Sequence, residues 1–131
     1  MQSPTIVNFD GSDPQYGGAI YQGSTFEAYV TVRDLQGVPV SLADYTLAAQ
    51  ARRSYKDVTP AFTFTTNFQD TTENGILYPA SVIHLFLGAS VTRNIPPALY
   101  KYDVELTLAT NSEIVIKPFL GTIKVINEVT K

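Results

Sequence analysis

Alternation of apolar and polar residues along several short segments is the feature that most constrains how this chain can fold. In the segment 99–108 apolar side chains occupy every second position from residue 100 onward, and they are Tyr100, Tyr102, Val104, Leu106 and Leu108. Successive side chains of a β-strand point to opposite faces of a sheet, so this spacing predicts a strand with one buried face. The segments 25–33, 45–53 and 119–126 alternate in the same way.

The number and spacing of these segments predict the fold class. Further short strands are expected over 61–66, 81–87 and 113–117. Between them we expect a polar loop over 67–75 that ends in the turn pair Asn74-Gly75, and one helical turn over 88–95. Roughly seven short strands, at intervals of about 8 to 12 residues, are typical of a two-sheet protein. The sequence therefore predicts an all-β fold, an antiparallel immunoglobulin-like β-sandwich of about seven strands.

The first 18 residues differ in composition from the rest of the chain. They are rich in Gly, Pro, Asp, Asn and Ser, and they contain a lone apolar pair, Ile6 and Val7. With 131 residues in all, we expect one β-sandwich domain over residues 19–131, preceded by an extended N-terminal arm over residues 1–18. Such an arm can add a strand to the open sheet edge of a neighbouring protein, which would bury Ile6 and Val7 there.

Composition argues against several kinds of chemistry. The chain has no cysteine, so it has no disulfide, thiolate nucleophile or cysteine-bound zinc. The single histidine, His84, lies in an apolar segment and is interpreted as structural. Asp103 and Glu105 share a predicted strand face with Lys101, which indicates a solvated polar face rather than a pair of catalytic acids. We therefore expect no enzyme activity, no metal and no cofactor.

Charge and hydropathy limit the expected partners. The formal net charge of −3 provides no basic surface for a phosphate backbone, so nucleic acid is not an expected partner. No apolar run approaches the roughly 20 residues that cross a bilayer, and the N-terminus does not have the pattern of a signal peptide. We expect no membrane partner, and assembly in the cytoplasm. Calcium binding by Asp10, Asp13 and Asp34 is an alternative, although the spacing of Asp10 and Asp13 is not that of an EF-hand loop.

Outward-facing tyrosines and one short basic segment are the other candidate partner-binding side chains. Tyrosine is favoured at protein interfaces because its ring buries a large area at little entropic cost, although it can also stack on sugars. The basic segment 52–56 is expected to bring one arginine to a carboxylate at an interface. Together with the arm, the predicted partner-binding residues are Thr5, Ile6, Val7, Phe9, Tyr16, Tyr21, Arg52, Arg53 and Tyr55.

The order of several segments resembles that in small virion structural proteins of tailed phages, notably cyanophage-type myophages. The segments include 20–26 (IYQGSTF), 32–42 (VRDLQGVPVSL), 100–106 (YKYDVEL) and 121–125 (GTIKV). The resemblance covers residues 19–131 and implies an immunoglobulin-like part of a virion. Similar domains lie at the N-termini of baseplate and receptor-binding adaptor proteins, and others decorate capsids.

The patterns and the resemblance lead to one expectation about function. We expect a non-enzymatic bacteriophage virion structural protein of the tail or baseplate, present in several copies in a symmetric assembly. It would join other virion proteins through its edge strands and its N-terminal arm. A capsid decoration protein of the same fold is one alternative, and a carbohydrate-binding module for host recognition is another.

Overall fold

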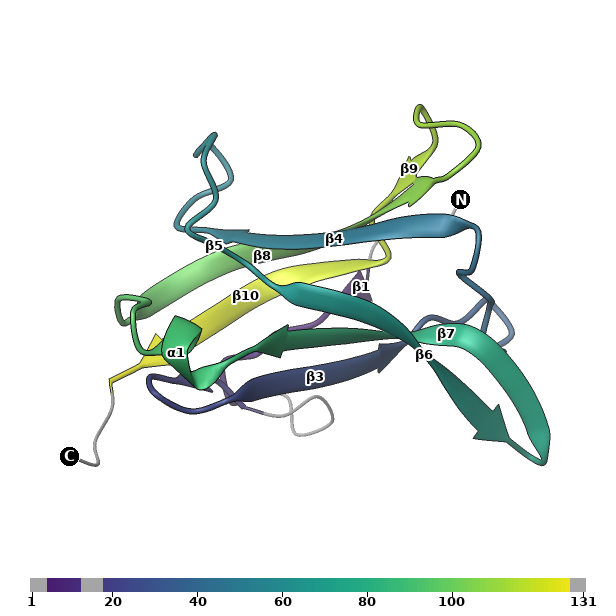
Figure 1. The fold of residues 1–131 in the computed structure, drawn as a ribbon, viewed down its shortest axis with the longest axis horizontal. Coiled ribbons are helices and arrows are strands. Elements are labelled where there is room, and N and C mark those ends of the chain that lie inside the picture. The colour runs from purple at the N-terminus through teal and green to yellow at the C-terminus, as the bar shows by residue number, and fades with distance from the viewer. Residues whose placement is uncertain (1–4, 13–17, 128–131) are drawn as a thin grey trace.

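The computed structural model describes residues 5–12 and 18–127, and within them two β-sheets face each other across one core (Figure 1). The larger sheet runs in the order β1 (Thr5–Ile6), β10 (Phe119–Ile126), β8 (Ala98–Leu108), β4 (Tyr45–Arg52) and β5 (Phe62–Thr63). Two short strands join it, β2 (Ile20–Tyr21) beside β10 and β9 (Val115–Ile116) beside β8. The smaller sheet runs in the order β3 (Phe26–Thr31), β7 (Ile76–Leu87) and β6 (Thr65–Glu73). A single helical turn, α1 (Ala89–Thr92), lies between β7 and β8.

The core lies between the two sheets and is rich in aromatic rings. On β8 the predicted alternation is confirmed, since every second side chain from Tyr100 to Leu106 is buried. Four rings form a closed cluster with neighbouring centroids 5.5 to 6.2 Å apart, and they are Phe9, Phe26, Phe64 and Tyr102. Tilted and edge-on ring pairs at such distances are favourable. The prediction of an all-β, sandwich-like protein is therefore confirmed.

The polar segment after residue 64 is a strand, where the sequence predicted a loop over 67–75. It forms β6, which pairs antiparallel with β7 along most of its length. Threonine favours strands because its branched side chain packs well on a pleated surface, so a polar composition does not prevent pairing here. The predicted turn is present, because Asn74 and Gly75 have φ angles of 54° and 78° and close the hairpin directly.

A purely antiparallel sandwich of about seven strands is not confirmed. Both β1 and β2 pair parallel with β10, one after the other along the same edge. β1 and β2 were not predicted because each has only two residues, which is too short for an alternation of side chains to be seen in the sequence. The larger sheet is thus mixed, and its outer strand is built from the N-terminal part of the chain.

Residues 5–9 lie against the sandwich, which corrects the prediction of a free arm over this stretch. The amides of Val7 and Phe9 donate hydrogen bonds to the carbonyls of Leu120 (2.9 Å) and Thr122 (2.8 Å) on β10. Val7 and Phe9 are fully buried, whereas Ile6 is 62% exposed. Val7 and Phe9, which were predicted to bind a partner, therefore belong to the core of their own domain. Ile6 remains exposed on the surface.

Gly121 makes this arrangement possible. A side-chain Cβ at Gly121 would lie 2.2 Å from the carbonyl oxygen of Val7, so only glycine leaves room for the N-terminal backbone. The Val7 oxygen accepts a hydrogen bond of 2.6 Å from the hydroxyl of Tyr102, which satisfies a buried carbonyl. Asn8 Oδ1 accepts from the amide of Thr122 at 2.9 Å. We call this set of interactions the Val7–Gly121 contact.

Replacing Gly121 tests this contact. We expect Gly121→Ala to lower the free energy of unfolding by about 2 to 3 kcal/mol, since the added methyl group meets backbone that cannot move without breaking the pairing. Chemical denaturation of the purified protein measures the change. Gly18→Ala is the matched control, because a Cβ at Gly18 has no neighbour within 4 Å. Equal stabilities for the two variants would contradict the contact.

A second pair of substitutions tests whether the N-terminal segment belongs to the core. Phe9→Ala removes a fully buried ring and is expected to cost about 3 to 5 kcal/mol of folding stability. Ile6 lies three residues earlier and its side chain is exposed, so Ile6→Ala is expected to change the free energy of unfolding by less than about 0.5 kcal/mol. Thermal unfolding monitored by circular dichroism distinguishes the two. If both variants melt like the unsubstituted protein, residues 5–9 do not pack as described.

Candidate functional site

The outer half of the β6–β7 hairpin projects beyond the sandwich (Figure 1). A β-bulge between Gln69 and Thr71 marks the point where it leaves the sheet. There the carboxylate of Asp70 accepts a hydrogen bond of 2.8 Å from the amide of Ala80, whose φ angle is 50°. A bulge bends its strand and redirects the residues beyond it. We call residues 71–78 the distal hairpin.

Solvent reaches both faces of the distal hairpin. Ile76 and Leu77 are adjacent, so their side chains point to opposite faces, and they are 54% and 60% exposed. Beyond the bulge the two strands pair only with each other among the described residues. An isolated two-stranded ribbon has little stability of its own, and exposed apolar side chains on both faces are suited to burial against another protein.

One ion pair ties the distal hairpin to the rest of the domain. The guanidinium of Arg33 donates two hydrogen bonds to the carboxylate of Glu73, at 2.9 and 2.6 Å, and a third to the carbonyl of Gly37. These hydrogen bonds lower the pKa of the Glu73 carboxyl below its usual value. A bidentate pair restricts the direction in which the ribbon projects. The hairpin is thus oriented by its base and by this ion pair.

The smaller sheet also presents two edges. In the order β3-β7-β6, the strands β3 and β6 each pair on one side only within the described part of the chain. The unpaired side of an edge strand carries backbone donors and acceptors that can receive a further strand. β6 is the longer of the two edges and leads into the distal hairpin.

The predicted basic segment is divided between two environments. Arg53 lies against the ring of Tyr100, with its guanidinium carbon 5.5 Å from the ring centroid. Arg52 and Tyr55 instead line a groove on the outer face of the larger sheet, together with Gln50, Asp57, Asp103, Glu105 and Lys117. Arg53 therefore contributes to packing, while its two neighbours face a concave polar surface.

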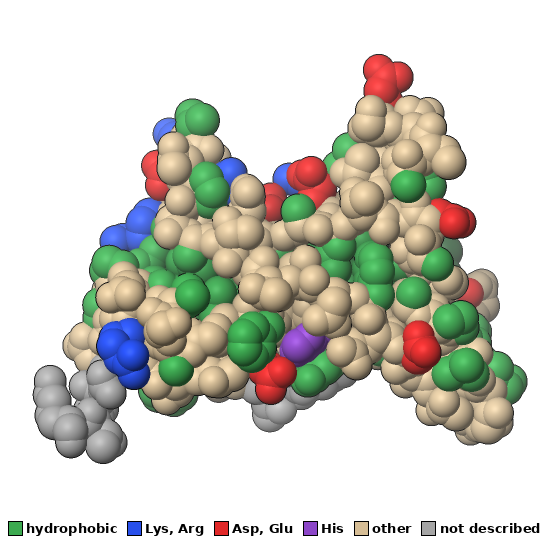
Figure 2. All heavy atoms as spheres, in the orientation of Figure 1, with side chains coloured by type: hydrophobic (Ala, Val, Ile, Leu, Met, Phe, Trp, Pro, Cys, Tyr) green, Lys and Arg blue, Asp and Glu red, His purple; other side chains and the backbone are tan. Residues whose placement is uncertain are grey.

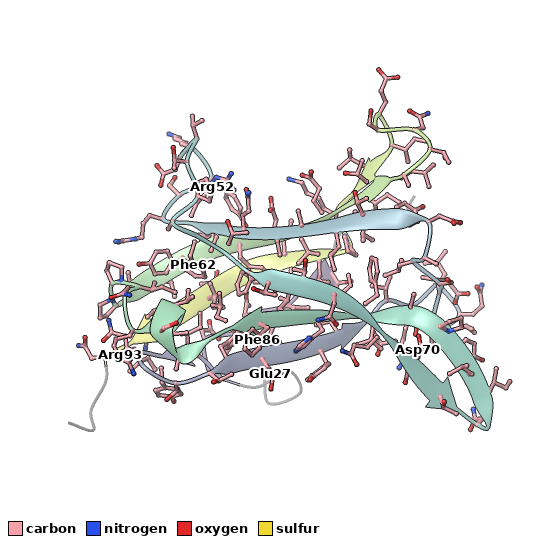
Figure 3. All side chains as sticks on the ribbon, viewed as in Figure 1. Glu27, Arg52, Phe62, Asp70, Phe86 and Arg93 are labelled. Carbon is pink, nitrogen blue, oxygen red and sulfur yellow. The ribbon has the colours of Figure 1, made fainter. Side chains whose placement is uncertain are left out.

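The groove lies between two projections of the molecule. One is the loop that connects β4 to β5, and the other is the turn over 109–114 that precedes β9; Figure 2 shows the hollow between them. Arg52 stands at the base of the first projection (Figure 3). Lys117 donates a hydrogen bond of 2.9 Å to the carboxylate of Asp103, which raises the pKa of Lys117 above its usual value.

The remaining predicted residues do not join this groove. Thr5 and Ile6 lie exposed on β1, at the edge of the larger sheet, and Tyr21 is 52% exposed on β2. Tyr16 lies outside the described residues. The predicted partner-binding residues therefore do not form one surface. The exposed residues of the distal hairpin were missed, although the Asn74-Gly75 pair followed by Ile76 and Leu77 was a sequence signal for an exposed apolar turn.

His84 takes part in a hydrogen-bonded row on the outer face of the smaller sheet. Its Nδ1 lies 3.0 Å from the side-chain nitrogen Nδ2 of Asn67, and its Nε2 lies 3.0 Å from a carboxylate oxygen of Glu27. The ring of Tyr29 stacks on the imidazole with centroids 4.5 Å apart. Both ring nitrogens are thus engaged by neighbouring strands. No group of three or more metal-binding side chains occurs among the described residues.

Comparison with known proteins gave no family. No family model and no curated protein matches the chain. Six solved chains match, and one comes from a structure of a family 123 glycoside hydrolase from Clostridium perfringens, described for glycolipid glycan hydrolysis. That match has a TM-score of 0.48 and 13% identity, and it covers 86% of this chain but 23% of the other. It is too distant to transfer a fold class or an activity.

No helix in the described ranges is long and apolar enough to span a membrane.

Proposed function

We propose that the protein is a non-enzymatic structural subunit of a bacteriophage virion, in the tail or baseplate, and that its sandwich belongs to the immunoglobulin-like class. The distal hairpin is the observation that supports this proposal best. It places Ile76 and Leu77 in solvent on a ribbon that has no other sheet to pack on among the described residues. Burying each of these side chains against a partner would contribute about 1.5 to 3 kcal/mol.

The proposed partners are other virion proteins, and several copies of the chain would join a symmetric assembly. The free side of β6 can pair with a strand of the partner while the distal hairpin inserts its apolar residues. Pairing of this kind combines backbone hydrogen bonds with side-chain burial. The hydrogen bonds set the register between β6 and the partner strand, and the burial adds to the binding affinity. The N-terminal segment has a smaller role than the sequence predicted, because Val7 and Phe9 are buried, which leaves the exposed Thr5 and Ile6 as its candidate partner-binding residues.

Substitutions in the distal hairpin test this function. We expect the double variant Ile76→Asp/Leu77→Asp to reduce the copy number of the protein in purified virions by at least about tenfold, since charges at a buried contact oppose docking. Quantitative immunoblotting of purified particles measures the copy number. The melting temperature of the isolated protein should be unchanged because both side chains are exposed.

Val58→Asp is the matched control. Val58 is 91% exposed on the loop between β4 and β5, so it tests an added charge at an apolar position away from the hairpin. Normal incorporation of both the double variant and the control would contradict docking through the hairpin.

Labelling with an antibody distinguishes the location. The proposal predicts label on tails, whereas label on heads would favour capsid decoration by a protein of the same fold. Absence of the protein from purified particles would contradict both.

A further inference from the structure

We propose that the groove over the larger sheet is a binding site for an uncharged oligosaccharide. The groove is distinct from the distal hairpin, because it lies on the outer face of the other sheet. The proposal is independent of any role in a virion and rests on the shape, chemistry and rigidity of the groove. We infer that Tyr55, Glu105 and Asp103, which all line the groove, contact the same ligand.

The groove offers the types of polar group that sugar hydroxyls need. Each hydroxyl both donates and accepts hydrogen bonds, so a binding surface must supply donors and acceptors side by side. Glu105 and Asp103 supply carboxylate oxygens, Arg52 supplies a planar set of donors, and Gln50 supplies both. Figure 2 shows that the hollow is open, as a site for a chain of sugar units requires.

Tyr55 supplies an apolar surface at the wall of this groove. Tyr55 is 59% exposed, and a tyrosine that is accessible to this extent can lie against the C–H face of a sugar. The loop that carries Tyr55 is held by local hydrogen bonds, in which the amide of Ser54 donates to Asp57 (3.2 Å) and the amide of Lys56 donates to the hydroxyl of Ser54 (3.2 Å). The ring is therefore presented from a braced loop.

The polar groups of the groove are already oriented by one another. Arg52 donates to the side-chain oxygen of Gln50 at 2.9 Å, and Lys117 donates to Asp103 at 2.9 Å. Gln50, Arg52, Asp103 and Glu105 stand on the central strands β4 and β8, whose backbones are paired with each other along eight residue pairs. Groups on rigid strands lose little freedom when a ligand binds, which favours affinity.

Charge indicates an uncharged ligand in preference to an acidic one or a protein. The lining has two cations, Arg52 and Lys117, against three carboxylates, which gives a formal balance of −1. This balance disfavours phosphate, sulfate and sialic acid groups. Centres of protein interfaces are depleted in charged residues, and this groove is lined mainly by them. The distal hairpin, with its apolar tip, has the opposite character.

A glycan array tests the proposal with the purified 131-residue chain. The array carries uncharged oligosaccharides, namely glucans, mannans, galactans and N-acetylhexosamine oligomers, with sialylated and sulfated oligosaccharides as the acidic set. We expect binding within the uncharged set. Calorimetry with the best-binding oligosaccharide should then show that Tyr55→Ala and Glu105→Ala each weaken binding by about tenfold or more.

Tyr21→Ala is the matched control, since Tyr21 has a similar exposure on β2, away from the groove. It should bind like the unsubstituted protein, and circular dichroism should show all three variants folded. The proposal is overturned if the array shows no binding or only acidic ligands. It is equally overturned if Tyr21→Ala weakens binding as much as Tyr55→Ala. None of these results depends on incorporation into particles.

Discussion

The Val7–Gly121 contact is the interaction on which the rest of the structure depends. At this point the backbone of the N-terminal segment passes over Gly121, and the hydroxyl of Tyr102 satisfies the carbonyl that would otherwise be buried without a partner. Phe9 follows two residues later and contacts Phe26 of the smaller sheet and Tyr102 of the larger one. A segment at the start of the chain thereby joins the two sheets.

This arrangement determines which surfaces remain available. The N-terminal segment covers the edge of β10, so that edge cannot receive a strand from another molecule without displacing residues of the core. The edges of the smaller sheet, the β5 edge of the larger sheet and the distal hairpin are left, and the hairpin also offers exposed apolar side chains. The groove over the larger sheet offers charged and planar polar groups instead. The exposed surfaces of the two sheets therefore differ in their chemistry.

Local patterns in the sequence predicted the parts of the fold that local physics determines. The alternation from Tyr100 to Leu106 predicted β8, and the Asn74-Gly75 pair predicted the turn between β6 and β7. The burial of Val7 and Phe9 could not be predicted, because it depends on parallel pairing with residues more than 100 positions later in the chain. Neither segment has a sequence pattern that identifies the strand with which it pairs. The alternation over 119–126 includes Gly121, but the need for glycine at this position is visible only once the N-terminal backbone lies against it.

The candidate sites show the same limit. Arg52 and Tyr55 were singled out from their local sequence, yet the groove also needs Glu105 and Lys117, which only the pairing of β4 with β8 and the return of the chain after β9 bring near them. The exposure of Ile76 and Leu77 depends on how far the hairpin extends past the sandwich. Such properties arise from tertiary structure and leave little trace in residue order.

Hydrogen exchange at the amides of Val7 and Phe9 measures directly whether the N-terminal segment is held against β10. Both amides donate to carbonyls of β10, so in the isolated protein they should exchange as slowly as the amides in the centre of the larger sheet. Two-dimensional NMR after transfer into deuterated water resolves the individual sites. We expect slow exchange at both positions, and exchange at the rate of an unstructured chain would contradict the pairing of residues 5–9 with β10.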